Sequence, residues 1–381
     1  MNVRLKKHQV YIALRDRIRS GALAPGERLC GEHQLAAEFS VSRVTLREAL
    51  ELLVQDQLLQ RIPRKGTYVS RNVGGGSYLL VSGDYKDDLS SPVSYILAGL
   101  EKRLGEAGRS LEYCSQRFIQ GLEPDNAAKI FEKNHIDGVF LIESNFYGTE
   151  GELLLLKECG LPVVVPHGCA ADRAHFDFPL LLSDYRQAFG DGVRCLASLG
   201  HRRVGTLALE ASVRNGQYCR DYSYQDYLEL LKYNQLDTDK SLLESATYDR
   251  ESVRMALRRM LLGPKPPSAI ICFSDFLAIH VYEVLKDMNI LIPEQVSVMG
   301  FCGFPGGNFL DPPLSTVDLG YSEIGTMAAD LMLRSSEWFD KGDPPLTVCT
   351  PHRVLLRKST APFGPPQKLF ANALLSHQCT F

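Results

Sequence analysis

Two arginines, Arg43 and Arg47, lie four residues apart in the stretch VSRVTLREAL, residues 41–50. In a helix this spacing puts both side chains on one face, and Ser42 precedes them as a candidate N-cap. The opposite face is apolar and carries Leu46, Ala49, Leu50 and Leu53. Paired arginines on a helix can contact guanine edges and phosphates of duplex DNA, but a solvated surface helix has the same pattern. The neighbouring sequence has to distinguish the two.

The flanking segments predict a helix-turn-helix followed by a wing. One helical pattern begins near His8 and stops at Gly21, and a second covers residues 32–40. After Leu59, two short extended segments flank the basic tip Arg64-Lys65-Gly66. In such a module the third helix enters the major groove, and the wing lies against the adjacent minor groove. The combination favours a DNA reader over a solvated surface helix.

The charge distribution agrees with this interpretation. The whole chain of 381 residues has a net charge of −3, but residues 1–71 contain 13 Lys and Arg against 7 Asp and Glu, which gives +6. The rest of the chain is therefore acidic, at −9. A small basic domain is the usual electrostatic signature of a nucleic-acid binder.

Residues 4–71 resemble the winged-helix head of the GntR family. The matching strings are GERLCGEHQLA, VSRVTLREAL and KGTYV, in the family's order and spacing. The resemblance implies DNA contacts for Ser42, Arg43, Thr45, Arg47 and Gly66, with Arg64 and Lys65 beside them in the wing. His33 stands where the family often has a DNA-contacting arginine, so a contact at this position would be sensitive to pH.

Beyond the glycine-rich stretch RNVGGGSY, residues 71–78, short apolar runs alternate with amphipathic stretches. This alternation predicts a multidomain α/β protein, with an N-terminal winged helix-turn-helix and two parallel, Rossmann-like sheets behind it. Ligands of such sheets bind outside the carboxyl ends of the strands. No phosphate-loop or dinucleotide fingerprint follows a strand, which disfavours a nucleotide enzyme.

The second half resembles the effector domain of the LacI/GalR family, which shares its fold with periplasmic sugar-binding proteins. The resemblance rests on LASLGHRRVGTLAL, RDYSYQDYLEL, PPLSTVD, LLRKST and the long string over residues 268–301. It implies a two-lobed body over residues 78–360. The expected organisation is a head over 1–71, a linker over 72–77, lobes of about 78–182 with 318–348 and 183–317 with 349–360, and a tail over 361–381.

The same resemblance implies an effector site. Arg220 takes the position of the effector-binding arginine, whose planar fork could clamp sugar hydroxyls. Ser274 replaces the usual asparagine before Asp275, and Cys302 replaces a usual aspartate, so two common sugar ligands are missing. Aromatic and crossover positions fall on Tyr248, Tyr321, Ser183 and Asp184, and the first loop supplies Ser91.

Each assignment has a structural alternative. Arg220 could pair with Asp221 or Asp226 at the surface, and Asp275 could cap the helix that follows it. Tyr248 and Tyr321 could belong to the core, since aromatic side chains are mostly buried. His201, in LGHRRVG, is better explained as a structural residue of its string than as a catalytic one.

These observations favour a transcription regulator, a repressor, that binds a double-stranded DNA operator as a homodimer and responds to a small polar effector, preferentially a sugar. One alternative is a constitutive DNA-binding protein whose site has lost its ligand; another, less favoured for lack of a catalytic motif, is an enzyme. The ten scattered cysteines predict reduced core thiols and no metal site, and we expect no cofactor. The absence of a secretory signal and of long apolar runs predicts a cytoplasmic protein with no membrane role.

Overall fold

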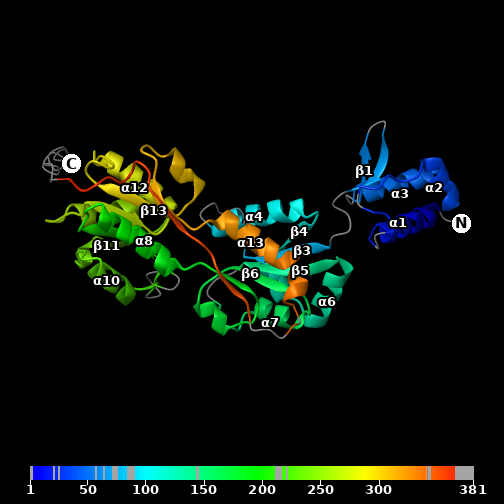
Figure 1. Cartoon of the computed structure of the whole chain (residues 1–381), viewed down its shortest axis with the longest axis horizontal. Helices are drawn as coiled ribbons and strands as arrows, with labels where there is room; N and C mark the ends of the chain where they lie inside the picture. The colour runs from blue at the N-terminus through cyan, green and yellow to red at the C-terminus, as the bar shows by residue number, and fades with distance from the viewer. Residues whose placement is uncertain are drawn as a thin grey trace, which may run out of the picture. The chain divides into compact units, whose positions relative to one another are not determined.

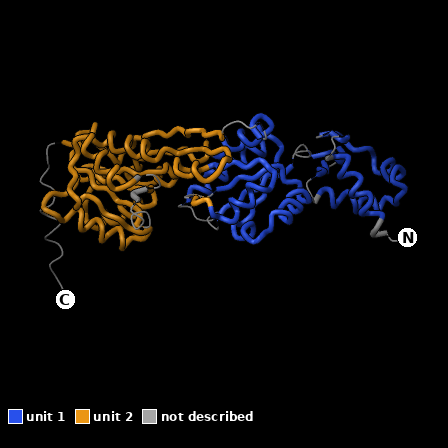
Figure 2. Tube along the Cα trace, turned by 90° about the horizontal axis from the view of Figure 1, so that it is seen from below, with its two compact units in different colours: residues 1–142, 149–166, 325–343 blue, residues 143–148, 167–324, 344–381 orange. Residues whose placement is uncertain are grey.

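The computed structural model describes residues 3–19, 22–24, 26–55, 58–62, 65–70, 76–83, 91–142, 146–210, 217–219, 222–339, 341 and 345–364. They fall into two compact units (Figure 2). Unit 1 comprises residues 1–142, 149–166 and 325–343, and unit 2 comprises residues 143–148, 167–324 and 344–381. Arg64, Arg220 and the linker residues 72–75 lie outside the described residues.

The N-terminal part of unit 1, the head, is a three-helix module with a wing. Its helices are α1 (Val3–Arg19), α2 (Glu32–Glu38) and α3 (Arg43–Gln55). The apolar face predicted for α3 is buried, together with one side of α1. These side chains form a separate small core of Val10, Leu14, Ile18, Leu29, Leu35, Ala36, Leu46, Ala49, Leu50, Leu53, Leu59 and Val69. Packing of this face holds α3 in place and leaves its other side at the surface.

The wing pairs β1 (Leu59–Ile62) with β2 (Gly66–Val69) in antiparallel register, Leu59 opposite Val69 and Ile62 opposite Gly66. A third segment, around Arg28, forms an isolated antiparallel bridge with Tyr68. The predicted wing is therefore confirmed, and it is broader than the sequence indicated.

The remainder of unit 1 is α/β. It contains β3 (Ser77–Ser82), α4 (Pro92–Glu106), β4 (Ser110–Ser115), α5 (Gln116–Gln120), α6 (Pro124–Lys133), β5 (Ile136–Ile142), α7 (Gly151–Glu158), β6 (Val163–Gly168) and most of α13 (Tyr321–Leu333). Strands β4, β3, β5 and β6 are parallel neighbours, with α4 and α13 on one face and α6 and α7 on the other (Figure 1). Gly325 lets α13 approach α4 closely, since a Cβ there would lie 2.0 Å from the Ile96 carbonyl oxygen.

Unit 2 is also an α/β unit, with helices packed against a largely parallel sheet. Its elements are η1 (Ala171–Ala174), β7 (Leu180–Leu182), α8 (Tyr185–Ser198), β8 (Val204–Leu209), β9 (Gln217–Cys219), β10 (Tyr222–Ser223), α10 (Tyr224–Tyr233), η2 (Lys240–Leu242), β11 (Leu243–Ala246), α11 (Arg250–Leu261), β12 (Ala269–Cys272), α12 (Asp275–Asp287), β13 (Ser297–Cys302), η3 (Pro305–Phe309), β14 (Ser315–Asp318), β15 (Thr347–Cys349) and β16 (Arg353–Leu355). One six-stranded sheet has the order β11-β8-β12-β13-β14-β16, and the other has the order β15-β7-β6-β5-β3-β4. Parallel pairing dominates both, so the predicted fold class is confirmed.

Along β12 and β13, the central strands of the sheet β11-β8-β12-β13-β14-β16, successive side chains point to opposite faces, and both faces are packed against helices. Ile270, Cys272 and Val298 pack with α11 and α12 in a buried core. The intervening residues Ile271 and Met299 face α8, where a Cβ on Gly192 would lie 3.1 and 3.3 Å from their side chains. Strands buried on both faces explain why these runs are continuously apolar in the sequence.

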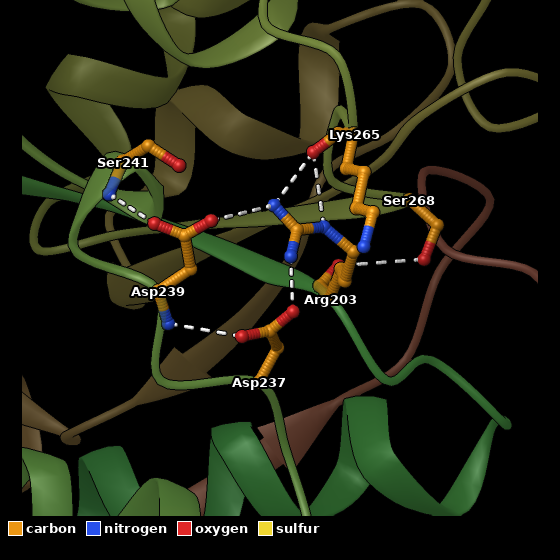
Figure 3. A network of polar contacts seen from close by, with 6 residues as sticks. All are labelled: Arg203, Asp237, Asp239, Ser241, Lys265 and Ser268. Carbon is orange, nitrogen blue, oxygen red and sulfur yellow. Dashed lines mark hydrogen bonds and ion pairs between the residues drawn. The ribbon is translucent and has the colours of Figure 1, made fainter.

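At the amino ends of these strands, Arg203 ties two loops together (Figure 3). Its guanidinium donates to the Lys265 carbonyl at 2.6 and 2.9 Å and pairs with Asp237 and Asp239. His201 beside it is buried and bonded to Ser268 Oγ at 2.8 Å and to the Ala361 carbonyl at 3.1 Å. The LGHRRVG string therefore fastens the framework, as expected for His201.

The cysteine prediction is wrong in one respect. Of the eight cysteines whose side chains the structure describes, none is in a disulfide, but only Cys169 and Cys272 are buried. Cys30 and Cys349 are exposed, and the others are partly exposed: Cys114, Cys159, Cys195 and Cys302. Most of them are therefore peripheral to the core. Across the part of the chain that the structure describes, no helix has the length and apolar character needed to cross a bilayer.

Candidate functional site

The start of α3 is capped by Ser42. Its hydroxyl accepts a hydrogen bond from the Thr45 amide at 3.1 Å and lies 2.8 Å from Thr45 Oγ1. Ser42 is exposed, whereas Thr45 is only 7% exposed. The predicted cap is present, and the Thr45 hydroxyl is engaged in it. A DNA contact by Thr45 therefore stays a prediction that would require this hydroxyl to change partner.

Arg43 and Arg47 lie on the exposed side of α3 and share one carboxylate. Glu32, at the first position of α2, accepts from Arg47 Nε at 2.7 Å, and Arg43 Nη2 lies 3.9 Å from the same oxygen. Two guanidinium groups facing one carboxylate keep this surface positive. Val44, between them in sequence, is 66% exposed and could contact a thymine methyl group.

The wing presents a further basic surface. Lys65 and Gly66 are exposed at its tip, and Gly66 has φ of +123°, a conformation that favours glycine. The Arg28 guanidinium lies directly beside Gly66. His33 is exposed at the start of α2, next to Glu32. Arg43 and Arg47 on α3, and Arg28 and Lys65 at the wing, thus add exposed positive charge to Arg17 on α1, which pairs with Glu38 at 2.5 Å.

In unit 2, four predicted effector residues follow carboxyl ends of one parallel sheet. Strands β8, β11, β12, β13 and β14 run parallel, so these ends share an edge. Tyr248 follows β11, Ser274 follows β12, Cys302 ends β13 and Tyr321 follows β14. The structure thus brings to one edge residues that are separated by up to 73 positions, from 248 to 321.

The polar groups after β12 are engaged within the framework. Ser274 caps α12 by accepting from the Phe276 amide at 3.1 Å, so the alternative that Asp275 is the cap is wrong. Asp275, 1% exposed, instead accepts from the Phe304 amide and from the Thr316 hydroxyl, each at 2.6 Å. Burial raises the pKa of Asp275 to about 7, against the opposing effect of these hydrogen bonds and of Arg357. Asp275 therefore acts as a brace between three segments.

That brace holds the loop after β13 in a strained conformation. Cys302 has φ of +94°, which is rare for a residue with a side chain, and Gly303 follows at +76°. A Cβ on Gly303 would lie 2.5 Å from Asp318 Oδ1. Strain of this kind persists only where the surroundings fix it, and it is frequent at ligand sites. The Asp275 bond to the Phe304 amide supplies one such restraint.

Aromatic side chains surround this edge. Tyr321 is buried, stacks on Phe304 with ring centres 5.8 Å apart, and lies 2.9 Å from the Tyr185 hydroxyl. Burial raises its pKa well above the usual value. Tyr248, in contrast, is 40% exposed and meets the Phe276 ring edge-on. Tyr321 is therefore a core residue here, while Tyr248 keeps a face available to solvent.

The remaining predicted residues are framework groups or lie outside the described chain. Ser183 is buried, with its hydroxyl 3.1 Å from Thr350 Oγ1, and exposed Asp184 caps α8 by accepting from the Gln187 amide at 2.8 Å. Ser91, in unit 1, caps α4. Arg220 lies outside the described residues, and Asp226, one of its possible partners, pairs with Arg186 at 3.1 Å. No group of three or more His, Cys, Asp or Glu within the described residues could hold a metal ion.

Comparison with known families bears on both parts of the chain. A family model described as bacterial regulatory proteins, gntR family, matches residues 6–69, and one described as a periplasmic binding protein-like domain matches residues 193–360. The chain joins a GntR-type head to a periplasmic-binding-protein-like body. Both resemblances noted in the sequence are thereby confirmed.

Similar proteins include an arabinose metabolism transcriptional repressor of Geobacillus stearothermophilus, which is 26% identical over 84% of this chain and 87% of its own length. Among solved structures, a complex of the transcriptional regulator CelR with cellobiose matches at 19% identity with a TM-score of 0.58, over 87% of this chain and all of its own. A LacI family regulator from Enterococcus faecium with bound ribose matches at 19% identity with a TM-score of 0.57, over 76% of this chain and all of its own. These structural matches show that the chain shares the fold of LacI-type regulators.

The sequence did not single out two residues of the GntR-type head. Glu32 lies within GERLCGEHQLA, but only the structure shows that it meets both α3 arginines. Arg28 precedes Leu29 in the same string, and its proximity to the wing follows from the bridge to Tyr68. Neither contact is local in sequence, so no periodicity could have indicated it.

Proposed function

We propose that this chain is a transcription regulator, a repressor, that binds duplex DNA through its GntR-type head and is controlled by a small polar molecule bound to its body. The observation that carries the proposal is the surface of α3. Its apolar side is packed into the head, while Arg43, Val44 and Arg47 face outward. Such a helix can enter the major groove, where arginine reads guanine and an apolar group reads thymine.

On the DNA side, two heads of a homodimer would occupy half-sites about one helical turn apart, roughly 34 Å. The head alone is too small to offer a stable dimer interface, so the body would supply the contact between the two subunits. The protein would act in the cytoplasm, where the DNA is accessible. Its relatives are transcriptional repressors, and we propose binding rather than catalysis.

On the effector side, a sugar is the favoured ligand class. The named arabinose relative and the cellobiose and ribose complexes support it. Within unit 2, the strand edge with half-exposed Tyr248 and strained Cys302 is the proposed place of contact, with Arg220 as a further ligand. Effector binding would change the affinity of the head for DNA by about 1–3 kcal/mol, the usual size of such coupling.

A second candidate is a constitutive regulator whose body binds no effector. It is favoured by one observation: the side chains of Ser274 and Asp275 are already used inside the framework. A ligand would have to find its hydrogen bonds elsewhere on the edge.

One experiment tests the proposed function. Selection of bound duplexes from a random library by the purified chain should enrich a sequence, which is then measured by fluorescence anisotropy against a scrambled duplex. Tighter binding to the enriched duplex is expected. Equal affinity for duplex, scrambled duplex and single strand contradicts a sequence-specific regulator.

A further inference from the structure

The segment before α2, around Arg28, pairs with β2 as a third extended segment of the wing. The Val69 amide donates to the Glu27 carbonyl at 2.8 Å, and the Leu29 amide donates to the Thr67 carbonyl at 2.9 Å. These bonds place Arg28 directly opposite Tyr68. Antiparallel geometry then brings the Arg28 side chain within diagonal reach of Gly66, two residues before Tyr68.

The Arg28 guanidinium lies against the backbone of the wing tip. A Cβ built on Gly66 would lie 3.0 Å from Arg28 Nε and 3.4 Å from Nη2. Only glycine leaves this space open without displacing the guanidinium, and the φ of +123° favours glycine at the same position. Gly66 therefore allows a close approach between the wing backbone and a charged side chain.

The charge of Arg28 is not neutralised by its surroundings. Arg28 is exposed, and no ion pair involves it among the described residues. The neighbouring Glu27 carboxylate is turned away and accepts from the Ala24 amide at 2.7 Å. Arg61, the other arginine described in the wing, lies 3.6 Å from Glu51. Exposed Lys65 adjoins Gly66, so Arg28 and Lys65 flank the glycine with two available positive charges.

We propose that Arg28 and Lys65 form a clamp for a phosphate group of the DNA backbone, with Arg28 as the residue that fixes its position. A guanidinium presents a planar pair of N–H donors that matches two phosphate oxygens, whereas an ammonium acts as a point charge. The clamp rests on the proposed DNA-binding function and adds a contact outside α3. Phosphate contacts position a protein on DNA without reading its sequence.

The test uses the full chain and a fluorescent mixed-sequence duplex, because a phosphate contact does not depend on sequence. Anisotropy titrations over salt concentrations from about 50 to 200 mM give the dependence of log K on log salt, whose slope changes by about 0.9 for each phosphate contact. Arg28→Gln keeps an extended stem but removes the charge, and Arg28→Lys keeps the charge but loses the fork. Arg258→Gln, on the exposed side of α11, is a control for net charge.

Arg28→Gln should make the slope shallower by about 0.9 and weaken binding, while Arg28→Lys should keep the slope and weaken binding less. Arg258→Gln should leave the slope unchanged. If the slope and affinity of both Arg28 variants match those of Arg258→Gln, the clamp is wrong although the protein binds DNA. A wild-type chain that ignores the duplex overturns the clamp together with the proposed function. A thermal melt of each variant confirms folding, and the lysine variant remains informative if glutamine disturbs the wing.

Discussion

Arg47 Nε donates to Glu32 Oε2 at 2.7 Å, so the first turn of α2 is joined to the outer face of α3. Both side chains are partly exposed, and exposed ion pairs contribute little to stability. The contact therefore matters more for the direction of the Arg47 guanidinium than for the fold. It holds a long side chain that would otherwise sample several rotamers before meeting DNA.

Arg47→Ala should weaken binding to the enriched duplex by about 1–3 kcal/mol, because one arginine contact to a base is lost. The buried face of α3 is untouched, so the melting temperature should change little. Anisotropy at fixed salt measures the affinity, and Arg258→Ala serves as the charge control. Equal affinities for the two variants would remove Arg47 from the interface.

Glu32→Gln should narrow the difference between the enriched and scrambled duplexes. Loss of the negative charge beside two arginines favours any phosphate backbone, so binding to the scrambled duplex should tighten. Arg47 loses its charged partner at the same time and is less well oriented for base contact. The ratio of the two affinities is the measurement, and a ratio equal to that of wild type would show that Glu32 has no orienting role.

A sugar at a hundred times its Kd should raise the free energy of unfolding by about 2.7 kcal/mol, which a thermal-shift screen of pentoses, hexoses and disaccharides detects. Arg220→Ala should abolish the shift while leaving DNA binding unchanged. A normal shift in that variant would mean that the position carried over from the family is misplaced. No shift with any sugar, for wild type, favours the constitutive candidate or another ligand class.

Asp275 should make stability depend on pH in an unusual direction for a carboxyl group. The pKa of Asp275 is about 7 in the folded protein and 3.8 for an unperturbed carboxyl group, as in the unfolded chain, so the folded state binds the proton more tightly. The contribution of this proton is fully present below pH 3.8 and is lost as pH rises to about 7. Asp275→Asn removes this titration. The free energy of unfolding of the variant, measured by denaturant unfolding across that range, should therefore lack the fall with rising pH that Asp275 contributes in the wild type.

His201 has the opposite effect and must be held constant in that comparison. Burial lowers its pKa below 6.5, so its contribution to stability is present above that pH and is lost as pH falls. Both the wild type and Asp275→Asn retain His201, so the difference between their curves isolates Asp275. Parallel curves would show that Asp275 is ionised throughout the range.

Much of the fold was predictable from the sequence, because the determining patterns are local. The apolar face of α3, its Ser42 cap and the basic wing each follow from spacing within a few residues. Buried parallel strands such as β12 and β13 read as continuous apolar runs. The carboxyl-edge position of Tyr248, Ser274 and Cys302 then follows from topology alone.

The roles of individual polar side chains were less predictable. Asp275 stands next to the cap position, and only the return of β13 and β14 shows that its partners are the Phe304 amide and the Thr316 hydroxyl. Glu32 and Arg47 are fifteen residues apart and meet because of the angle between two helices. Such contacts depend on tertiary geometry that residue types and spacing do not encode.

Strand β16, residues Arg353–Leu355, forms the outer edge of the sheet of unit 2, antiparallel to β14. During synthesis the β14 edge therefore stays unpaired until residues 353–355 have left the ribosome, whereas the residues of the head are made within the first 70. Unpaired edges are prone to association with other chains. Truncated products that end before Arg353 should accordingly carry a complete head on a body with an unpaired β14 edge, and such products should aggregate more readily than the chain that includes β16.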